Sequence, residues 1–221
     1  MTELLEQLSV CVEFGKIDIK SPYPPAMRDQ EGAFELTRAA LEQGISPGEI
    51  LEEALIPAMS RVGQKFSRNE IFVPQMLMAA KAMSSSMIHI RPYYLSGETK
   101  RRGTFIIGTV TGDLHDIGKN LVAMMIEGSG WEIVDLGVDV SADKFIQAAE
   151  KHPGAVIGLS ALLTTTMENM RRTVTTLREK YPDIKIRVGG APVTAEFSQK
   201  IGADYYSPDP QGAVEYLRAL A

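Results

Sequence analysis

The sequence predicts an α/β protein in which a small helical bundle precedes a parallel, doubly wound sheet. Residues 1–94 show only the three-to-four-residue spacing of apolar side chains that is typical of amphipathic helices. From residue 104, short apolar segments alternate with helical segments, which is the pattern of consecutive β-α units. Residues 95–103 are polar. We therefore expect a helical domain at 1–94, a linker at 95–103 and a second domain at 104–221.

Four helices are expected in the first domain. They are a helix along the stripe Leu4, Leu5, Leu8 and Val12, then helices at 30–43, from Ser46 toward Phe66, and from about Val73 to Tyr93. The proline-rich segment 21–25 must interrupt the chain, because proline cannot continue a helix. Gly44 suits the end of the second helix, Ser46 can cap the third, and Pro57 can kink it. Short connections between four helices favour a bundle.

The fourth helix is rich in methionine, at Met76, Met78, Met83 and Met87. Methionine adapts to irregular gaps, so these side chains can simply fill the core of the bundle. Alternatively, part of the bundle lies over a large, flat ligand. The sequence leaves both interpretations open.

Five strand–helix units are expected in the second domain. The strands are predicted at 104–110, 131–136, 154–160, 184–188 and 203–206, and the helices at 117–129, 141–151, 165–180, 194–201 and 210–220. Right-handed crossovers between them give the strand order 2-1-3-4-5, which is flavodoxin-like. In such sheets, ligands bind at the carboxyl ends of the strands, where the first and third strands lie side by side.

Polar and small residues follow three of these strands. His115 comes after the first strand with Asp113 two residues before it, an arrangement that suits a metal ligand and the carboxylate that orients it. The third strand ends at Ser160, and the fourth at Gly189. Each has a simpler explanation, namely a solvated histidine, a helix-capping hydroxyl or a turn glycine. Their meeting at one edge favours a ligand site.

Composition and motifs exclude several functions. The net charge of −5 and the absence of a basic block argue against nucleic acid or an anionic membrane as a partner. The single Cys11 fits a reducing cytosol, and without a signal sequence or a spanning segment we expect a cytoplasmic protein. No G-x-G-x-x-G follows the first strand, and Ser160 stands where a phospho-receiver needs aspartate, so dinucleotide-binding and receiver domains are rejected.

Three motifs resemble the B12-binding signature. They are Asp113-x-His115-x-x-Gly118, Ser160-x-Leu162 and Gly189-Gly190. In the helical half, Gly63-x-x-Phe66 and the segment 70–83 resemble the helical cap of methionine synthase and of methanogen and acetogen corrinoid proteins. The resemblance covers about residues 30–220. It is nearest to the small corrinoid proteins of methyltransferase systems.

The resemblance implies a cobalamin cofactor in its base-off form, with His115 as the lower ligand of cobalt. Asp113 would accept the other imidazole N–H, and Thr166 would extend this relay. Further cofactor-binding residues by this resemblance are Gly112, Asp116, Ile117, Gly118, Ser160, Leu162, Thr164, Gly189 and Gly190, with Phe72, Met76 and Phe66 as candidates for an apolar lid. The two glycines of the last motif would leave room for the nucleotide tail of the cofactor, and Ser160 and Thr164 would meet its displaced base.

The resemblance also implies a methyl carrier rather than a complete enzyme. A substrate-specific corrinoid methyltransferase would load the methyl group, a second methyltransferase would pass it to tetrahydrofolate or coenzyme M, and a reductive activase would restore the cofactor. The methyl donor stays open among methylamines, methanol, glycine betaine and aryl methyl ethers. The alternatives are a subunit of an adenosylcobalamin-dependent mutase and a cobalamin sensor.

Overall fold

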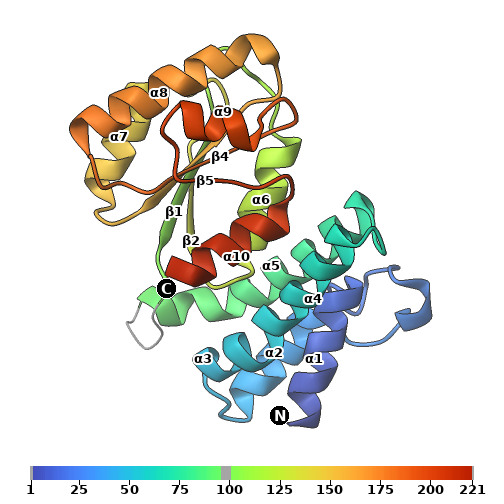
Figure 1. Cartoon of the computed structure of the whole chain (residues 1–221). Helices are drawn as coiled ribbons and strands as arrows, with labels where there is room; N and C mark the ends of the chain where they lie inside the picture. The colour runs from blue at the N-terminus through green and yellow to red at the C-terminus, as the bar shows by residue number, and fades with distance from the viewer. Residues whose placement is uncertain (1, 96–100, 221) are drawn as a thin grey trace. The chain divides into compact units, whose positions relative to one another are not determined.

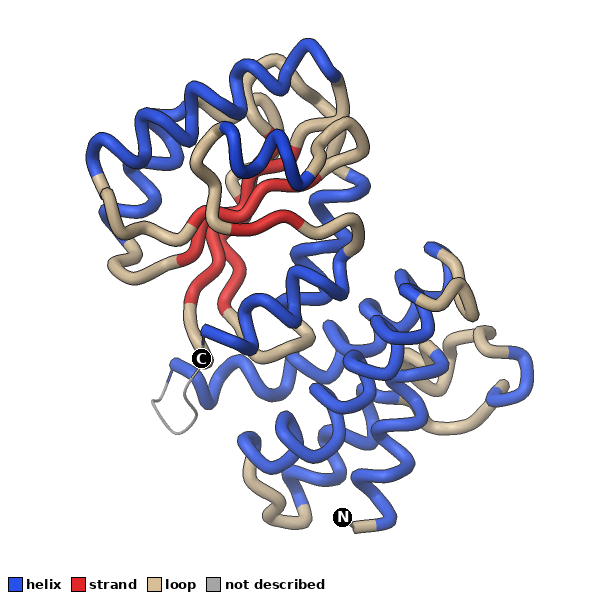
Figure 2. Tube along the Cα trace, in the orientation of Figure 1, coloured by secondary structure: helices blue, strands red, loops and turns tan. Residues whose placement is uncertain are grey.

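The computed structural model describes residues 2–95 and 101–220. The chain forms two compact units, one of residues 1–101 with 128–130 and one of residues 102–127 with 131–221. Figure 2 shows that the strands are confined to one unit, whereas the other consists of helices and loops. Residues 96–100 of the predicted linker lie outside the described residues.

The helical unit contains the four predicted helical segments (Figure 1). Its elements are α1 (Glu3–Phe14), the short turn η1 (Pro25–Met27), α2 (Ala33–Glu42), α3 (Pro47–Glu49), the turn η2 (Ile50–Leu55), α4 (Ile56–Ser67) and α5 (Val73–Leu95). The Thr2 side chain caps α1 by accepting from Leu5 N, and Gly15 ends this helix in a left-handed conformation. The predicted break at 21–25 falls in the loop between α1 and α2.

The third predicted helix is not uniform. It begins at Ser46, whose hydroxyl accepts from Glu49 N at 3.2 Å. Over Ile50–Leu55 it widens into a π-helical turn and then continues as α4. Pro57 lies just after the wide turn and has no N–H to donate to the preceding turn, so regular α-helical bonding is interrupted there.

The core of the helical unit accounts for most of the methionines of α5. Met76, Met83 and Met87 are buried, each with no more than 4% of its surface exposed. Core filling therefore explains these three positions. At the surface of the same unit, Glu13 of α1 binds Arg61 and Lys65 of α4, at 2.5 and 2.7 Å.

The second unit is a five-stranded parallel sheet with helices on both faces. Its strands are β1 (Thr104–Thr109), β2 (Glu132–Asp135), β3 (Val156–Ser160), β4 (Ile186–Gly189) and β5 (Tyr205–Tyr206). Its helices are α6 (Ile117–Glu127), α7 (Ala142–Lys151), the short turn η3 (Thr164–Thr166), α8 (Met167–Lys180), α9 (Ala195–Lys200) and α10 (Pro210–Leu220). The order β2-β1-β3-β4-β5 confirms the predicted topology.

The two faces of the sheet are covered by different helices (Figure 1). On one face, Ile157, Leu159 and Val188 pack with apolar residues of α7 and α8. Because side chains alternate along a strand, Gly158, Ser160 and Arg187 point to the opposite face, which α6 and α10 cover. The predicted strands begin up to two residues too early, because apolar residues continue into the loops that lead to them.

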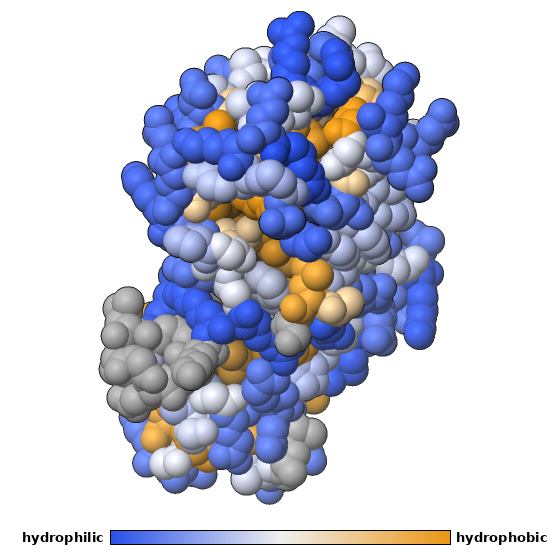
Figure 3. All heavy atoms as spheres, turned by 60° about the vertical axis from the view of Figure 1, so that its left-hand side comes forward, coloured by the Kyte–Doolittle hydropathy of each residue, from blue (hydrophilic) through white to orange (hydrophobic). Residues whose placement is uncertain are grey.

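The surface of the chain is mostly hydrophilic on the side shown in Figure 3, with apolar residues in separate patches. Along the described residues, no helix combines the length and apolar character needed to cross a membrane.

Candidate functional site

The candidate site lies at the carboxyl ends of β1, β3 and β4. Pairing places Thr109 beside Ser160, and Ser160 beside Gly189, so the loops that follow these strands start next to one another. The loops contain nearly all of the residues that the sequence singles out in this unit. The topology therefore brings together residues that are far apart in the chain.

Asp113 and His115 form the centre of this edge. The Oδ1 atom of Asp113 lies 2.8 Å from Nδ1 of His115 and also accepts from the backbone N of His115 at 3.1 Å. The Asp113 side chain is fully buried, whereas 51% of the His115 side chain is exposed. With Nδ1 facing the carboxylate, the Nε2 atom of the imidazole is the nitrogen left to bind a ligand.

A second loop holds the other oxygen of Asp113. Oδ2 accepts from Leu162 N at 2.7 Å, from Leu163 N at 3.2 Å and from the Thr166 hydroxyl at 2.8 Å. Burial alone would raise the pKa of Asp113, but these hydrogen bonds and those of His115 hold it well below its usual range. The carboxylate is therefore a fixed negative charge behind the imidazole.

Backbone contacts fix the shape of the loop around His115. The Thr109 hydroxyl donates to His115 O at 2.9 Å. Gly112 has a φ of +82°, which favours glycine, and its N–H donates to Asp139 Oδ1 at 2.8 Å. Asp139 and Thr109 were not identified from the sequence, because an aspartate in a turn and a threonine in a strand are too common to signal a site.

Large apolar side chains are exposed around this pair. Leu114 and Ile117 have 72% and 71% of their surface exposed, and Leu162 and Leu163 have 44% and 40%. Leu114, Leu162 and Leu163 come from the two loops that hold the Asp113–His115 pair, and Ile117 begins α6 directly after the first of them. Exposed apolar groups gathered at one place mark a surface that another molecule covers.

His115 is the candidate metal ligand at this edge. Within residues 2–95 and 101–220, no three His, Cys, Asp or Glu side chains are grouped as a metal cage. His115 alone could supply one ligand to a metal that brings its other ligands with it. A metal held in a flat, largely apolar ring brings its other ligands with it, and the ring itself can cover the exposed apolar side chains.

Gly189 and Gly190, the glycine pair at the end of β4, differ in the space that surrounds them. Gly190 has a φ of +129°, and a Cβ there would collide with the carbonyl oxygen of Ala161. Gly189 has ordinary space, since a Cβ would come no closer than 3.5 Å to the guanidinium of Arg187. Gly190 is thus needed for the close approach of the loops after β3 and β4.

Replacing Gly190 with alanine is expected to lower the free energy of unfolding of this unit by about 2–6 kcal/mol, because left-handed strain and overpacking each cost about 1–3 kcal/mol. Urea denaturation followed by the fluorescence of Trp131, the single tryptophan, measures it. Gly189→Ala is the matched control and should have a nearly unchanged midpoint. Equal losses in the two variants would contradict this explanation.

The other site residues predicted from the sequence differ from one another in burial and in contacts. Ser160 is half-buried at the end of β3, and Thr164 is exposed in η3. Asp116 accepts from Asn120 at 3.1 Å, and a Cβ on Gly118 would meet open space. In the helical unit, Phe72 is 63% exposed, Phe66 is half-buried and Met76 is buried.

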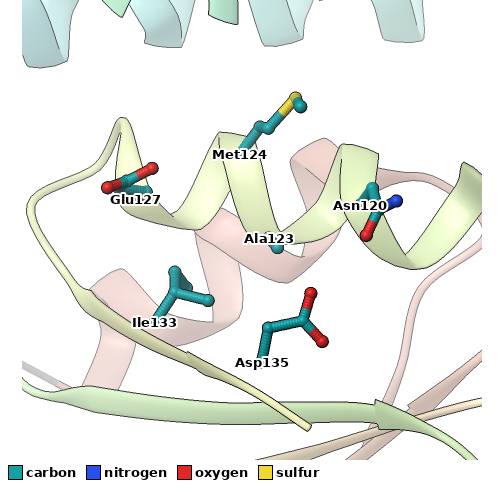
Figure 4. Close-up of a pocket in the computed structure, with 6 residues that line it drawn as sticks. All are labelled: Asn120, Ala123, Met124, Glu127, Ile133 and Asp135. Carbon is teal, nitrogen blue, oxygen red and sulfur yellow. The ribbon is translucent and has the colours of Figure 1, made fainter. Parts of the chain in front are cut away.

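Lys119 anchors the first turn of α6 beside the His115 loop. Its side chain is buried, and Nζ binds Asp135 Oδ2 at 2.5 Å and Asn120 Oδ1 at 2.7 Å. Asp135 and Asn120 also line a small cavity of about 150 Å³ between α6 and β2, where Figure 4 shows the Asp135 carboxylate pointing toward α6. The burial of Lys119 was not predicted from the sequence, since lysine is normally a surface residue.

A larger cavity, of about 590 Å³, lies at the opposite edge of the sheet. The loops that precede β3 and β4 line it, with His152 among the lining residues. Its two lysines already form ion pairs, Lys180 with Glu150 and Lys185 with Asp204. Size alone does not make it the functional site, because the convergent polar groups lie at the carboxyl edge.

Comparison with known proteins identifies both units. A family described as B12 binding domain matches residues 103–215, and a second family with the same description matches residues 27–91. Trimethylamine corrinoid protein 1 of Methanosarcina acetivorans is 40% identical over 196 residues, which cover 87% of this chain and 91% of the relative. Dimethylamine corrinoid protein 1 of Methanosarcina mazei is 38% identical over 182 residues, which cover 81% and 84%.

Solved structures agree with this assignment. A chain of the methanol:cobalamin methyltransferase complex MtaBC from Methanosarcina barkeri matches 99% of this chain and 79% of its own length, with a TM-score of 0.82 and 29% identity. A cobalamin-binding protein from Desulfitobacterium hafniense DCB-2 matches 97% of this chain and 98% of its own, with a TM-score of 0.74 and 27% identity. As its motifs predict, the chain therefore belongs to the family of B12-binding corrinoid proteins found in methyltransferase systems.

Proposed function

We propose that this protein carries a methyl group on a corrinoid between two methyltransferases, with His115 as the lower ligand of the cobalt. The observation that carries the ligand assignment is the Asp113–His115 contact of 2.8 Å, which leaves Nε2 as the coordinating nitrogen. The exposed Leu114, Ile117, Leu162 and Leu163 suit the face of a corrin ring. When bound, the corrinoid supplies the cobalt to which the methyl group is attached.

The residues of the chain hold and tune this cofactor. Asp113 keeps the proton of His115 on Nδ1, which fixes the tautomer that can coordinate through Nε2. Leu162 N, Leu163 N and the Thr166 hydroxyl keep Asp113 ionised and in place. The imidazole is thus held in one orientation and one tautomer, which suits it as a ligand.

We further propose that residues 1–94 form a cap domain, that residues 104–221 hold the corrinoid, and that 95–103 is the hinge between them. The match of residues 27–91 to a B12-binding family supports a role for the helices in cofactor binding. Phe72, which is exposed, is the proposed apolar contact of the cap. Met76 is buried in the helical unit and would act by supporting that surface from within.

The proposed partners are a substrate-specific methyltransferase, a second methyltransferase that passes the methyl group to tetrahydrofolate or coenzyme M, and a reductive activase. Relatives named for trimethylamine and dimethylamine, and the complex named for methanol, support the first partner. The identity of the methyl donor would follow from that substrate-specific partner.

Transfer of labelled methyl tests this function directly. The protein is loaded with cobalamin, reduced, and offered with purified trimethylamine, dimethylamine or methanol methyltransferase and the labelled substrate. We expect label to appear on the loaded protein with one of these enzymes and to leave it when an acceptor methyltransferase is added. Apoprotein is the control. A loaded protein that takes up no label with these three enzymes, nor with glycine betaine and aryl methyl ether methyltransferases, would contradict the proposal.

A further inference from the structure

Arg187 is a buried cation whose hydrogen bonds are incomplete. It belongs to β4 and has 4% of its surface exposed. Its Nη2 atom donates to Ser207 Oγ at 2.5 Å, whereas its Nε has no hydrogen-bond partner. Among the described residues, no carboxylate forms an ion pair with it within 4 Å. Asp209, which lies near enough to raise the pKa of Arg187, instead accepts from Gly212 N at 2.8 Å.

A buried arginine with incomplete hydrogen bonds lowers the stability of the folded state, and a purely structural role would not explain why it is there. Burying a charge without a paired charge, and a donor without an acceptor, each destabilise the folded state. Burial lowers the pKa of the Arg187 guanidinium to about 10, so the group is still protonated near neutral pH. A buried guanidinium with an open donor thus has capacity for an acceptor that the chain does not provide.

The surroundings of Arg187 show where that acceptor would lie. The strand pairing sets Gly158 beside Arg187, and Ser160 beside Gly189, so small residues adjoin it on the same face of the sheet. The space that a Gly189 side chain would take lies 3.5 Å from Nη1 and 3.7 Å from Nη2. The guanidinium therefore adjoins the glycine pair at the carboxyl end of β4.

A second unsatisfied group lies near it in the fold. Gln211, in the first turn of α10, is 3% exposed. Its Nε2 donates to Glu215 at 3.3 Å, but its Oε1 has no partner. α10 follows Ser207, the residue that Arg187 binds, on the face of the sheet to which Arg187 points (Figure 1). Gly212, the residue after Gln211, packs against Ser207, so the turn of α10 that contains Gln211 begins beside the residue that Arg187 binds.

We infer that Arg187, assisted by Gln211, binds polar atoms of the nucleotide tail of the corrinoid. This inference rests on the proposed function, since it concerns the same cofactor. For Arg187 the tail offers two kinds of acceptor, the phosphodiester oxygens and the ring nitrogens or hydroxyls of the base and ribose, and for the open Oε1 of Gln211 it offers a donor, the ribose hydroxyl. Arg187 is then a determinant of which corrinoids the protein accepts, because forms without the tail leave its donors unpaired.

The test compares corrinoids that differ only in the tail. Cobalamin, cobinamide phosphate and cobinamide, which lacks the nucleotide, are titrated into the wild type and Arg187→Met, and dissociation constants are measured by quenching of Trp131 fluorescence and by absorbance. We expect Arg187→Met to weaken cobalamin binding by about 10-fold to 100-fold, the range for a hydrogen bond to a charged group, with cobinamide unchanged. Gln211→Leu should weaken cobalamin binding by a smaller factor in the same direction.

The phosphate-bearing corrinoid separates the two acceptors. If Arg187→Met weakens cobinamide phosphate as well as cobalamin, the contact is to the phosphate; if it weakens cobalamin alone, the contact is to the base or ribose. Either outcome supports the inference.

Stability provides an independent readout. Methionine removes an unpaired buried charge at similar volume, so the urea midpoint of the Arg187→Met apoprotein should not fall. The control is Arg178→Met. Arg178 pairs with Asp204 at 2.5 Å, so its loss should lower the midpoint without changing the ratio of cobalamin to cobinamide affinity.

An equal loss of affinity for all three corrinoids in Arg187→Met, or no loss for any of them, would overturn the inference while leaving the proposed function intact. A wild type that binds no corrinoid at all would overturn both.

Discussion

Replacing Asp113 with alanine is expected to lower the free energy of unfolding of the sheet-containing unit by about 3–5 kcal/mol, the cost of breaking a buried charged network. The carboxylate is fully buried and accepts hydrogen bonds from four residues on two loops. Without it, the N–H groups of Leu162 and Leu163 and the Thr166 hydroxyl lose an acceptor in a place that water reaches poorly.

The fluorescence of Trp131 makes this measurement specific, because this buried tryptophan belongs to the sheet-containing unit. Urea denaturation of the apoprotein should show the loss without any cofactor present. Asp116→Ala, in the same loop, is the matched control and should cost about 1 kcal/mol or less, since Asp116 is exposed. The loss of unfolding free energy in Asp113→Asn should lie between those of Asp113→Ala and Asp116→Ala. A full-stability Asp113→Ala protein would show that the two loops are held together by other contacts.

The sheet could be predicted from the sequence because each strand is a short apolar run followed by an amphipathic helix. This repeating pattern determines a parallel sheet, and the handedness of the crossovers then determines the strand order. The edge at which Asp113, Ser160 and Gly189 meet follows from that order. In the helical unit, the wide turn at 50–55 was not predicted, because its apolar spacing does not differ enough from that of an α-helix.

The contacts that stabilise the site were less predictable. Asp113 is held in part by the backbone N–H groups of Leu162 and Leu163, and backbone donors leave no trace in the sequence. Lys119 and Arg187 are buried although their residue types favour the surface. For Arg187 a signal exists, since it interrupts the apolar run of β4 between Ile186 and Val188. A charged residue inside a central parallel strand is rare, so its presence there indicates a specific role.

His115→Ala is expected to abolish nitrogen coordination to the cobalt by the protein while leaving the fold intact. About half of the His115 side chain is exposed, so its removal should change the free energy of unfolding by less than about 1 kcal/mol. Its loss leaves Asp113 with the donors of Leu162, Leu163 and Thr166, which are enough to keep the carboxylate ionised. The two variants therefore separate stability from cobalt ligation. Asp113→Ala should lower the free energy of unfolding and weaken ligation, whereas His115→Ala should abolish ligation alone.

EPR of the divalent cobalt form can identify the ligand. A coordinated nitrogen splits the cobalt signal, and replacement of histidine nitrogen by ¹⁵N changes a triplet to a doublet only if the ligand is a histidine and not the base of the cofactor itself. We expect that change in the wild type and in His152→Ala, the control at the opposite edge of the sheet, and no splitting from protein nitrogen in His115→Ala. The chain has three histidines, and His89 packs against Phe34 within the helical unit. A doublet that persists in His115→Ala with ¹⁵N-labelled histidine would mean that another histidine coordinates the metal, whereas a triplet would come from the base of the cofactor. The Asp113–His115 pair would then have only a structural role. A half-exposed imidazole adds little to stability, and this argues against such a role.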